Sequence, residues 1–267
     1  MNFKLLLPTY RTRERFVRDV LGALGERPLG RMLNVGAGEG DIDPTLASYA
    51  TELESCDVNE DDVAHARALN EGVPNVRYSV QNGEALGFDD ASFDVVTCLE
   101  VIEHVSQPTA LLREIARVLR PGGTAILTCP SERFPVTYDP INAVISPTGK
   151  HLPLGAYGYG HSWLVNEAEL EAWLDDVGLQ VRNKSRLSGW LVGALECYWP
   201  GAMQRVLKAN AGNTTAAASS SAGRPVLRPS TEEPPLLTVV DALIALDRAA
   251  SGRSRRSVGL GYVLARA

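Results

Sequence analysis

The stretch RMLNVGAGEGD, residues 31–41, decides the fold class of this chain. It joins a short apolar run, residues 31–35, to three glycines, Gly36, Gly38 and Gly40. Glycines after a strand allow positive φ angles and let the backbone approach a ligand, and the free N–H groups of a following helix attract an anion. A tight turn that binds nothing would use the same residues, so the neighbouring elements have to distinguish the two interpretations.

Strands and helices are predicted to alternate around this stretch. Short apolar runs predict strands over 31–35, 52–56, 75–80, 93–99, 124–129, 179–187 and 258–267. Helical spacing of apolar residues predicts helices over 11–27, 61–70, 108–119, 166–178 and 236–250. Continuous apolar strands separated by helices are typical of a mostly parallel sheet with helices on both faces. We therefore expect a Rossmann-like α/β fold forming a single domain over residues 1–267, with ligands at the carboxyl ends of its strands.

Composition limits the class of protein. With 267 residues, 45% of them hydrophobic and 22% charged, the chain can bury an ordinary globular core. No run of 18 apolar residues occurs, so no membrane span is expected, and a formal net charge of -6 argues against nucleic acid as the main partner. The cysteines are scattered without CxxC spacing, which favours reduced core thiols and a cytoplasmic protein; they are Cys56, Cys98, Cys129 and Cys197.

Three segments break the alternation. Residues 130–165 contain repeated proline, glycine and aromatic residues and are expected to form a lid over the site. Residues 210–235 are small, polar and proline-rich, which predicts a flexible segment. Residues 189–203 are apolar and aromatic, and could shape an acceptor pocket, pair two subunits in a homodimer or touch a membrane surface, although burial in the core is the commoner outcome.

An acidic residue ends the second predicted strand. Asp57 stands where a carboxylate can accept hydrogen bonds from both hydroxyls of a ribose, so the pattern indicates a cofactor that contains a nucleoside. The dinucleotide fingerprint G-x-G-x-x-G would need glycine at position 41, where Asp41 stands, and the chain has no Tyr-x-x-x-Lys pair. Both observations disfavour an oxidoreductase that uses a nicotinamide dinucleotide.

At this point the sequence resembles the class I S-adenosylmethionine-dependent methyltransferases, closest to the branch with quinone-biosynthesis and other small-molecule enzymes. The resemblance rests on four segments in order: NVGAGEG (34–40), CDVNEDDVAHAR (56–67), NGEALGFDDASFDVVTCLEVIEHV (82–105) and LLREIARVLRPGGTAILTCP (111–130). It implies a seven-stranded sheet with an antiparallel last strand, S-adenosylmethionine as cofactor and a small-molecule or lipid-like acceptor, methylated at a hydroxyl. A non-catalytic protein that keeps the fold and the cofactor site is the alternative.

The resemblance also implies which residues contact the cofactor. Gly36, Ala37 and Gly38 would meet its methionine part, Asp57 its ribose and Val58 its adenine. The adenine edge and the methyl-bearing sulfur would be lined by Asn82, Gly83, Glu84, Leu99 and Glu100. Two positions depart from the family pattern, because Asn34 and Asn82 stand where the family commonly has acids. Asparagine keeps an acceptor oxygen but loses the negative charge, which weakens the attraction for a cationic cofactor.

Histidines are the candidate bases for a hydroxyl acceptor, whose proton has to be removed. His104 follows the fourth strand and His161 lies on the predicted lid, and these two are the predicted catalytic residues. His151, also on the lid, is more simply explained as a packing residue, and His65 as a surface residue.

The stretch LEVIEHV, residues 99–105, places Glu100, Glu103 and His104 at i, i+3 and i+4. If a helix starts here, all three side chains share one face. Some hydroxyl methyltransferases with this fold hold a divalent cation on a similar array, which would lower the pKa of the acceptor hydroxyl. The simpler interpretation is that the acids complement the dipole of a helix start, and we favour it over a metal site.

Overall fold

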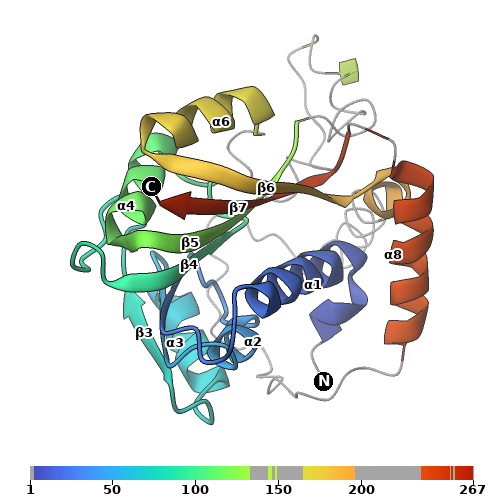
Figure 1. The fold of residues 1–267 in the computed structure, drawn as a ribbon. Helices are drawn as coiled ribbons and strands as arrows, with labels where there is room; N and C mark the ends of the chain where they lie inside the picture. The colour runs from blue at the N-terminus through green and yellow to red at the C-terminus, as the bar shows by residue number, and fades with distance from the viewer. Residues whose placement is uncertain are drawn as a thin grey trace.

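The computed structural model describes residues 3–132, 144–145, 148, 165–195, 236–252, 254 and 256–266. In these residues seven strands form one sheet in the order β3-β2-β1-β4-β5-β7-β6 (Figure 1). The strands are β1 (Arg31–Val35), β2 (Glu52–Asp57), β3 (Val76–Val80), β4 (Phe93–Leu99), β5 (Leu119–Pro130), β6 (Leu179–Ser188) and β7 (Gly259–Arg266). The helices are η1 (Phe3–Leu6), α1 (Pro8–Ala23), α2 (Asp43–Ala47), α3 (Glu60–Leu69), α4 (Pro108–Val118), α6 (Glu167–Asp176) and α8 (Leu237–Ser251).

Strand pairing confirms the predicted sheet. β1 pairs in parallel with β2 and with β4, and the pairs β2·β3 and β4·β5 are also parallel. β7 runs antiparallel to both of its neighbours, β5 and β6. The carboxyl ends of β1, β2, β4 and β5 therefore meet along one edge of the sheet, where the candidate site lies.

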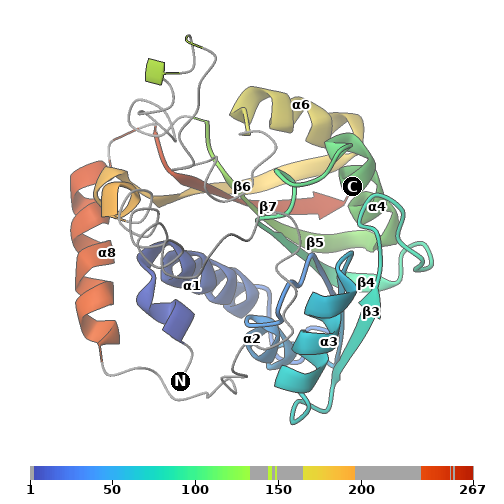
Figure 2. The same ribbon diagram turned by 180° about the vertical axis from the view of Figure 1, so that it is seen from behind.

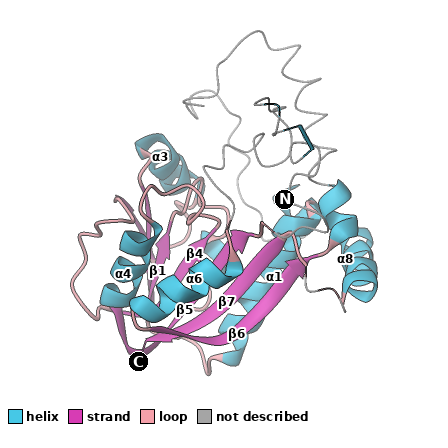
Figure 3. Cartoon of the chain, turned by 90° about the horizontal axis from the view of Figure 1, so that it is seen from above, coloured by secondary structure: helices cyan, strands magenta, loops and turns pink. Residues whose placement is uncertain are grey.

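Helices cover both faces of the sheet, as predicted. In Figures 1 and 2, α4 and α6 lie on one side of the strands and α1 on the other, and the view from above in Figure 3 agrees. Adjacent residues of β1 point to opposite faces: Met32 joins the core under α1 and α2, while Leu33 joins the core under α4 and α6. Each face of the sheet thus has its own apolar core.

Two predicted elements, α1 and β5, have bounds that differ from the prediction by three residues or more. α1 begins at Pro8, which suits the first turn of a helix, and ends at Ala23, before Gly25 with a φ of 142°. β5 begins at Leu119 instead of residue 124. Phe93 pairs with Leu119 and Val95 with Thr124, so the residues in between form a bulge that contains Gly122 with a φ of 76°.

The prediction that Glu100, Glu103 and His104 share one face of a helix is wrong. Glu100 has a φ of 57°, in the left-handed region, and residues 101–107 form turns and bends. The helix begins only at Pro108. Proline favours the first helical position and keeps the residue before it out of the helical region, so the chain crosses an irregular loop after β4.

The described residues also show how α6 is capped, the state of three cysteines and the character of the helices. Asn166 caps α6 by accepting hydrogen bonds from the N–H groups of Ala168 and Glu169, at 3.0 and 3.3 Å. Three of the four cysteines are free and buried, namely Cys56, Cys98 and Cys129. In the described part of the chain no helix is both long enough and apolar enough to span a membrane.

Several predictions lie outside the described residues. The flexible segment at 210–235, His151, His161 and Cys197 belong to this group. So do most of the predicted lid at 130–165 and the second half of the apolar segment at 189–203.

Candidate functional site

The glycine loop follows β1 and is fixed to β2 by its backbone. The N–H groups of Gly36 and Ala37 donate to the carbonyl oxygen of Cys56 at 2.8 and 2.9 Å. A Cβ on Gly36 would lie 2.2 Å from a methyl carbon of Val101, so this position needs glycine. A Cβ on Gly38 would meet nothing within 4 Å, and Gly38 has a φ of 53°. The loop is therefore packed behind Gly36 and open at Gly38, as a backbone that receives a ligand must be.

Asp57 ends β2 next to this loop. Its carboxylate accepts hydrogen bonds from the N–H of Gly38 at 2.8 Å and from the N–H of Asn59 at 3.0 Å. A carboxylate has about four acceptor positions, so two remain for hydroxyl groups of a ligand. Val58, the next residue, has 71% of its surface exposed and could lie against an aromatic ring.

A cavity of about 260 Å³ opens beside the loop. Its lining combines predicted cofactor residues with residues from the start of the chain: Lys4, Tyr10, Arg13, Asn34, Gly36, Ala37, Gly38, Glu39, Asp41, Ile42 and Leu99. Of the predicted set, Asn34, Gly36, Ala37, Gly38 and Leu99 are thus brought together in one cavity.

The N-terminal segment supplies a wall that the sequence did not predict. Lys4 forms ion pairs with Glu39, at 3.1 Å, and with Asp41, which fasten η1 to the glycine loop. Arg13, on α1, approaches Glu100 at 3.4 Å and lines the cavity. The arginines of residues 11–18 look like a solvated helix face in the sequence, and nothing in their local spacing distinguishes Arg13.

Asn34 lies below the loop and is 1% exposed. Its amide nitrogen donates to Asp43 at 2.8 Å, and its amide oxygen accepts from the hydroxyl of Thr97 at 2.9 Å. The side chain that replaces the family's acid is therefore held by two protein partners while it borders the cavity.

Asn82, Gly83 and Glu84 form the next loop along the chain. The side-chain oxygen of Asn82 accepts from the N–H of Glu84 at 3.0 Å. The carboxylate of Glu84 accepts from the N–H of Gln107 at 2.7 Å and from the hydroxyl of Ser106, and these bonds lower its pKa. Glu84 thus fastens this loop to the start of α4, a structural role that the sequence did not predict.

The three polar residues after β4, Glu100, Glu103 and His104, have different surroundings. The carboxylate of Glu100 accepts from the hydroxyl of Thr128 at 2.9 Å and faces Arg13. Glu103 is fully buried, and neither of its carboxylate oxygens has a hydrogen-bond partner among the described residues. His104 has a side chain 42% exposed, with its Nε2 3.9 Å from Glu103. Among the described residues no group of three or more His, Cys, Asp or Glu side chains is placed to hold a metal ion.

A second, larger groove of about 580 Å³ lies between α1, β6 and α8. Phe16, Arg186, Asp247 and Arg248 are among the residues that line it. None of the predicted site residues contributes to its lining.

The part of the chain that carries the cavity is similar to known methyltransferases. Residues 33–127, which contain the glycine loop, Asp57 and Leu99, match the family described as "Methyltransferase domain". A ubiquinone biosynthesis O-methyltransferase from Xanthomonas axonopodis pv. citri is 35% identical over 172 residues, which cover 59% of this chain and 70% of the relative. The chain belongs to the class I S-adenosylmethionine-dependent methyltransferases. It is therefore an enzyme that takes its methyl group from S-adenosylmethionine, and the expected resemblance to the quinone-biosynthesis branch is confirmed.

Solved structures show the same methyltransferase fold. Geranyl diphosphate methyltransferase in complex with SAM has a TM-score of 0.56 and 16% identity, covering 96% of this chain and 84% of that chain. Phosphoethanolamine N-methyltransferase 2 from Haemonchus contortus has a TM-score of 0.58 and 15% identity, and the match covers 95% of this chain and 52% of that chain.

Proposed function

We propose that this methyltransferase transfers the methyl group to a hydroxyl of a small or lipid-like molecule. The observation that carries the proposal is the similarity to ubiquinone biosynthesis O-methyltransferases, whose name gives oxygen as the methylated atom. The site agrees with this choice, because an exposed histidine, His104, follows the strand that ends at Leu99.

The cofactor site is proposed to be the cavity at the glycine loop. Gly36, Ala37 and Gly38 would hold the methionine part, with Arg13 facing its carboxylate as a cationic partner. Asp57 would accept hydrogen bonds from the ribose hydroxyls with its two remaining acceptor positions. The adenine would lie by Val58 and the loop of Asn82, Gly83 and Glu84, and Leu99 and Glu100 would border the sulfur. These residues fit the cofactor because the loop is open where backbone must approach it, at Gly38.

The bound cofactor supplies a methyl group already activated on a sulfonium. The protein therefore has to align the acceptor oxygen, exclude water and remove the hydroxyl proton. We assign that proton to His104, which follows β4 in the chain and has a side chain 42% exposed. His161 stays a second predicted base. Among the described residues Glu100, Glu103 and His104 are not placed to hold a metal ion together, and the mechanism proposed here uses none.

The acceptor atom can be tested with purified protein, methyl-labelled S-adenosylmethionine and three probes of matched size: a catechol, an aliphatic amine and a carboxylic acid. Labelling of the catechol, and its loss in His104→Gln with S-adenosylhomocysteine binding unchanged, supports the proposal. His65→Gln, at a partly buried histidine of α3, is the matched control. Labelling of the amine or the acid, with the catechol unmodified, would contradict a hydroxyl acceptor.

The homodimer, the absence of a nucleic-acid partner and the cytoplasmic location stay predictions. Light scattering, nucleic-acid binding and cell fractionation test them independently of the chemistry.

A further inference from the structure

A buried carboxyl group stands directly beside the position where this chain lacks the family's acid. Asp43, in the first turn of α2, is 0% exposed, and its Oδ1 accepts a hydrogen bond from the amide of Asn34 at 2.8 Å. Its Oδ2 accepts from the hydroxyl of Ser55 on β2, at 2.9 Å. Asn34, which is uncharged where the family commonly has an acid, is therefore in contact with the carboxyl group of Asp43.

Hydrogen-bond donors surround the buried carboxyl group of Asp43. The hydroxyl of Tyr78 hydrogen-bonds Asp43 and itself accepts from the amide of Asn70 at 2.7 Å, so its own proton is free to point at the carboxylate. The amide of Asn34 can only donate, because its oxygen is taken by the hydroxyl of Thr97. The pKa of Asp43 is raised above its ordinary value, chiefly by burial, and the hydrogen bonds from Tyr78, Ser55 and Asn34 oppose that rise. Three donors aimed at two oxygens fit a carboxylate.

The same network reaches the glycine loop. The N–H of Asp43 donates to the carbonyl of Gly40 at 3.3 Å, and the amide of Asn70 donates to that carbonyl at 2.9 Å. Asn34 separates Asp43 from the cavity that Gly36 and Gly38 line. A charge one side chain away, in a buried environment, acts across a low dielectric and is weakly screened.

We propose that Asp43 is a positioning residue that supplies, through Asn34, the negative charge that the family pattern carries at position 34, beside the proposed site for the amino-acid end of the cofactor. The inference rests on the proposed cofactor site. Asp43 stabilises the orientation of the Asn34 amide and supplies a charge below the glycine loop, without touching the cofactor itself. Asp43 lies nine positions after Asn34 in the chain and contacts it directly in the fold.

Calorimetric titration with two ligands tests this assignment. S-adenosylhomocysteine carries the amino-acid end, whereas 5'-methylthioadenosine lacks it and keeps the nucleoside. Asp43→Asn, which preserves shape and removes charge, is expected to weaken S-adenosylhomocysteine about tenfold, or about 1.4 kcal/mol, and to leave methylthioadenosine unchanged. The exchange Asn34→Asp with Asp43→Asn returns the charge to position 34 and is expected to restore binding to within about threefold of wild type.

Ser55→Ala is the matched control, because it removes one donor from Asp43 and keeps the charge. It is expected to lower the melting temperature without distinguishing the two ligands. If Asp43→Asn does not fold alone, the double variant carries the test, since the proposal requires it to bind S-adenosylhomocysteine.

Equal weakening of both ligands in Asp43→Asn, or failure of the double variant to recover binding, overturns the assignment and leaves Asp43 a structural residue. These outcomes differ from failure of the proposed cofactor site, in which the wild-type protein itself would bind neither ligand.

Discussion

The carboxylate of Asp57 accepts a hydrogen bond from the backbone N–H of Gly38 at 2.8 Å. This bond joins the end of β2 to the open part of the glycine loop, which follows β1. Because β1 and β2 are parallel neighbours, their carboxyl ends lie side by side and bring the acid to the loop. The glycine loop and the acid, which follow two successive strands in the sequence, are thus in direct contact in the fold.

Asp57→Asn should weaken the binding of S-adenosylhomocysteine by about ten- to a hundredfold, since hydrogen bonds to a charged acceptor each contribute about 1.5–3 kcal/mol. Calorimetry measures the change. Glu60→Gln, an exposed acid in the first turn of α3, is the control and should bind as wild type does. Equal affinity of Asp57→Asn and wild type would remove Asp57 from the ribose.

Arg13→Gln should weaken S-adenosylhomocysteine about tenfold or more and leave 5'-methylthioadenosine unchanged, because only the former carries a carboxylate for the guanidinium to pair with. Arg77→Gln, an arginine whose side chain is 69% exposed and which does not line the cavity, is the control. If both ligands weaken together, Arg13 acts on the loop and not on the carboxylate.

The sequence predicted the centre of the sheet well because the strands there are buried. The runs at 31–35 and 93–99 match β1 and β4 residue for residue, since a strand covered on both faces is mostly apolar. The site was predicted where residues follow these strands directly, at Gly36, Gly38 and Leu99, which the structure brings into one cavity.

Other parts of the site depend on contacts between distant segments. Arg13 lines the cavity because α1 packs on the sheet, and no local sequence pattern predicts such a contact. Asp43 meets Asn34 because the loop turns back over β1. The polar residues of the stretch 99–105 are spaced as on one face of a helix. The helix nevertheless begins only at Pro108, because Glu100 has a left-handed backbone conformation and the proline disfavours helical backbone in the residue before it.

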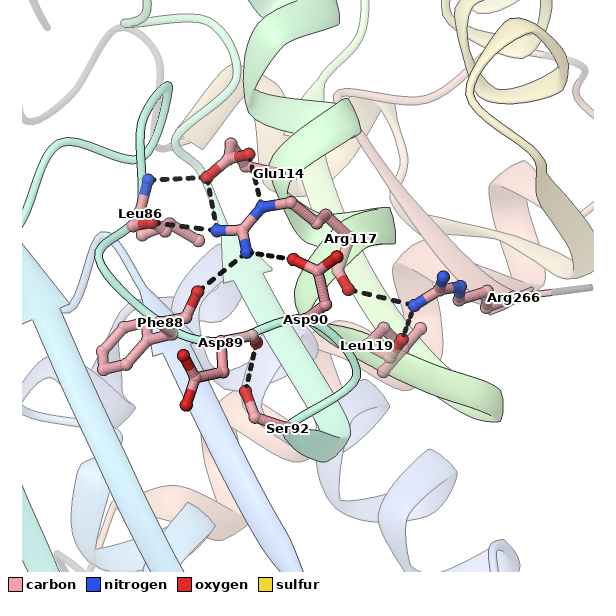
Figure 4. A network of polar contacts seen from close by, with 9 residues as sticks. All are labelled: Leu86, Phe88, Asp89, Asp90, Ser92, Glu114, Arg117, Leu119 and Arg266. Atoms are coloured by element: carbon pink, nitrogen blue, oxygen red, sulfur yellow. Dashed lines mark hydrogen bonds and ion pairs between the residues drawn. The ribbon is translucent and has the colours of Figure 1, made fainter.

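Arg117→Gln should lower the free energy of unfolding by about 2–3 kcal/mol, within the range for breaking a hydrogen-bond network. Its guanidinium donates to the carbonyls of Leu86 and Phe88 and to the carboxylates of Asp90 and Glu114 (Figure 4). Urea unfolding measures the loss. Arg113→Gln, an exposed arginine on the same helix, should change stability by less than about 0.5 kcal/mol. An equal effect of both substitutions would show that the network in Figure 4 contributes nothing specific.

Glu103→Gln should change how stability depends on pH. Burial raises the pKa of Glu103 well above its ordinary value, and the carboxylate of Glu100 raises it further. The neutral form is therefore favoured in the folded state, and its contribution to stability is lost as the pH rises toward the raised pKa, at about 1.4 kcal/mol per unit of elevation.

The variant should match wild type near pH 4 and become increasingly more stable than wild type as the pH rises above the ordinary Glu pKa of 4.5 toward the raised pKa of Glu103. Melting temperatures across that range check the prediction. Glu169→Gln, an exposed acid on α6, should stay parallel to wild type throughout. A constant difference between Glu103→Gln and wild type at every pH would show that folding does not raise the pKa of Glu103.

The central claim is that the cofactor lies at the glycine loop with its ribose on Asp57. A crystal structure of the protein with S-adenosylhomocysteine tests it most directly. We expect the homocysteine part against Gly36, Ala37 and Gly38 beside Arg13, and both ribose hydroxyls within hydrogen-bond distance of Asp57. Ligand bound in the groove between α1, β6 and α8, with the glycine loop free, would contradict the account.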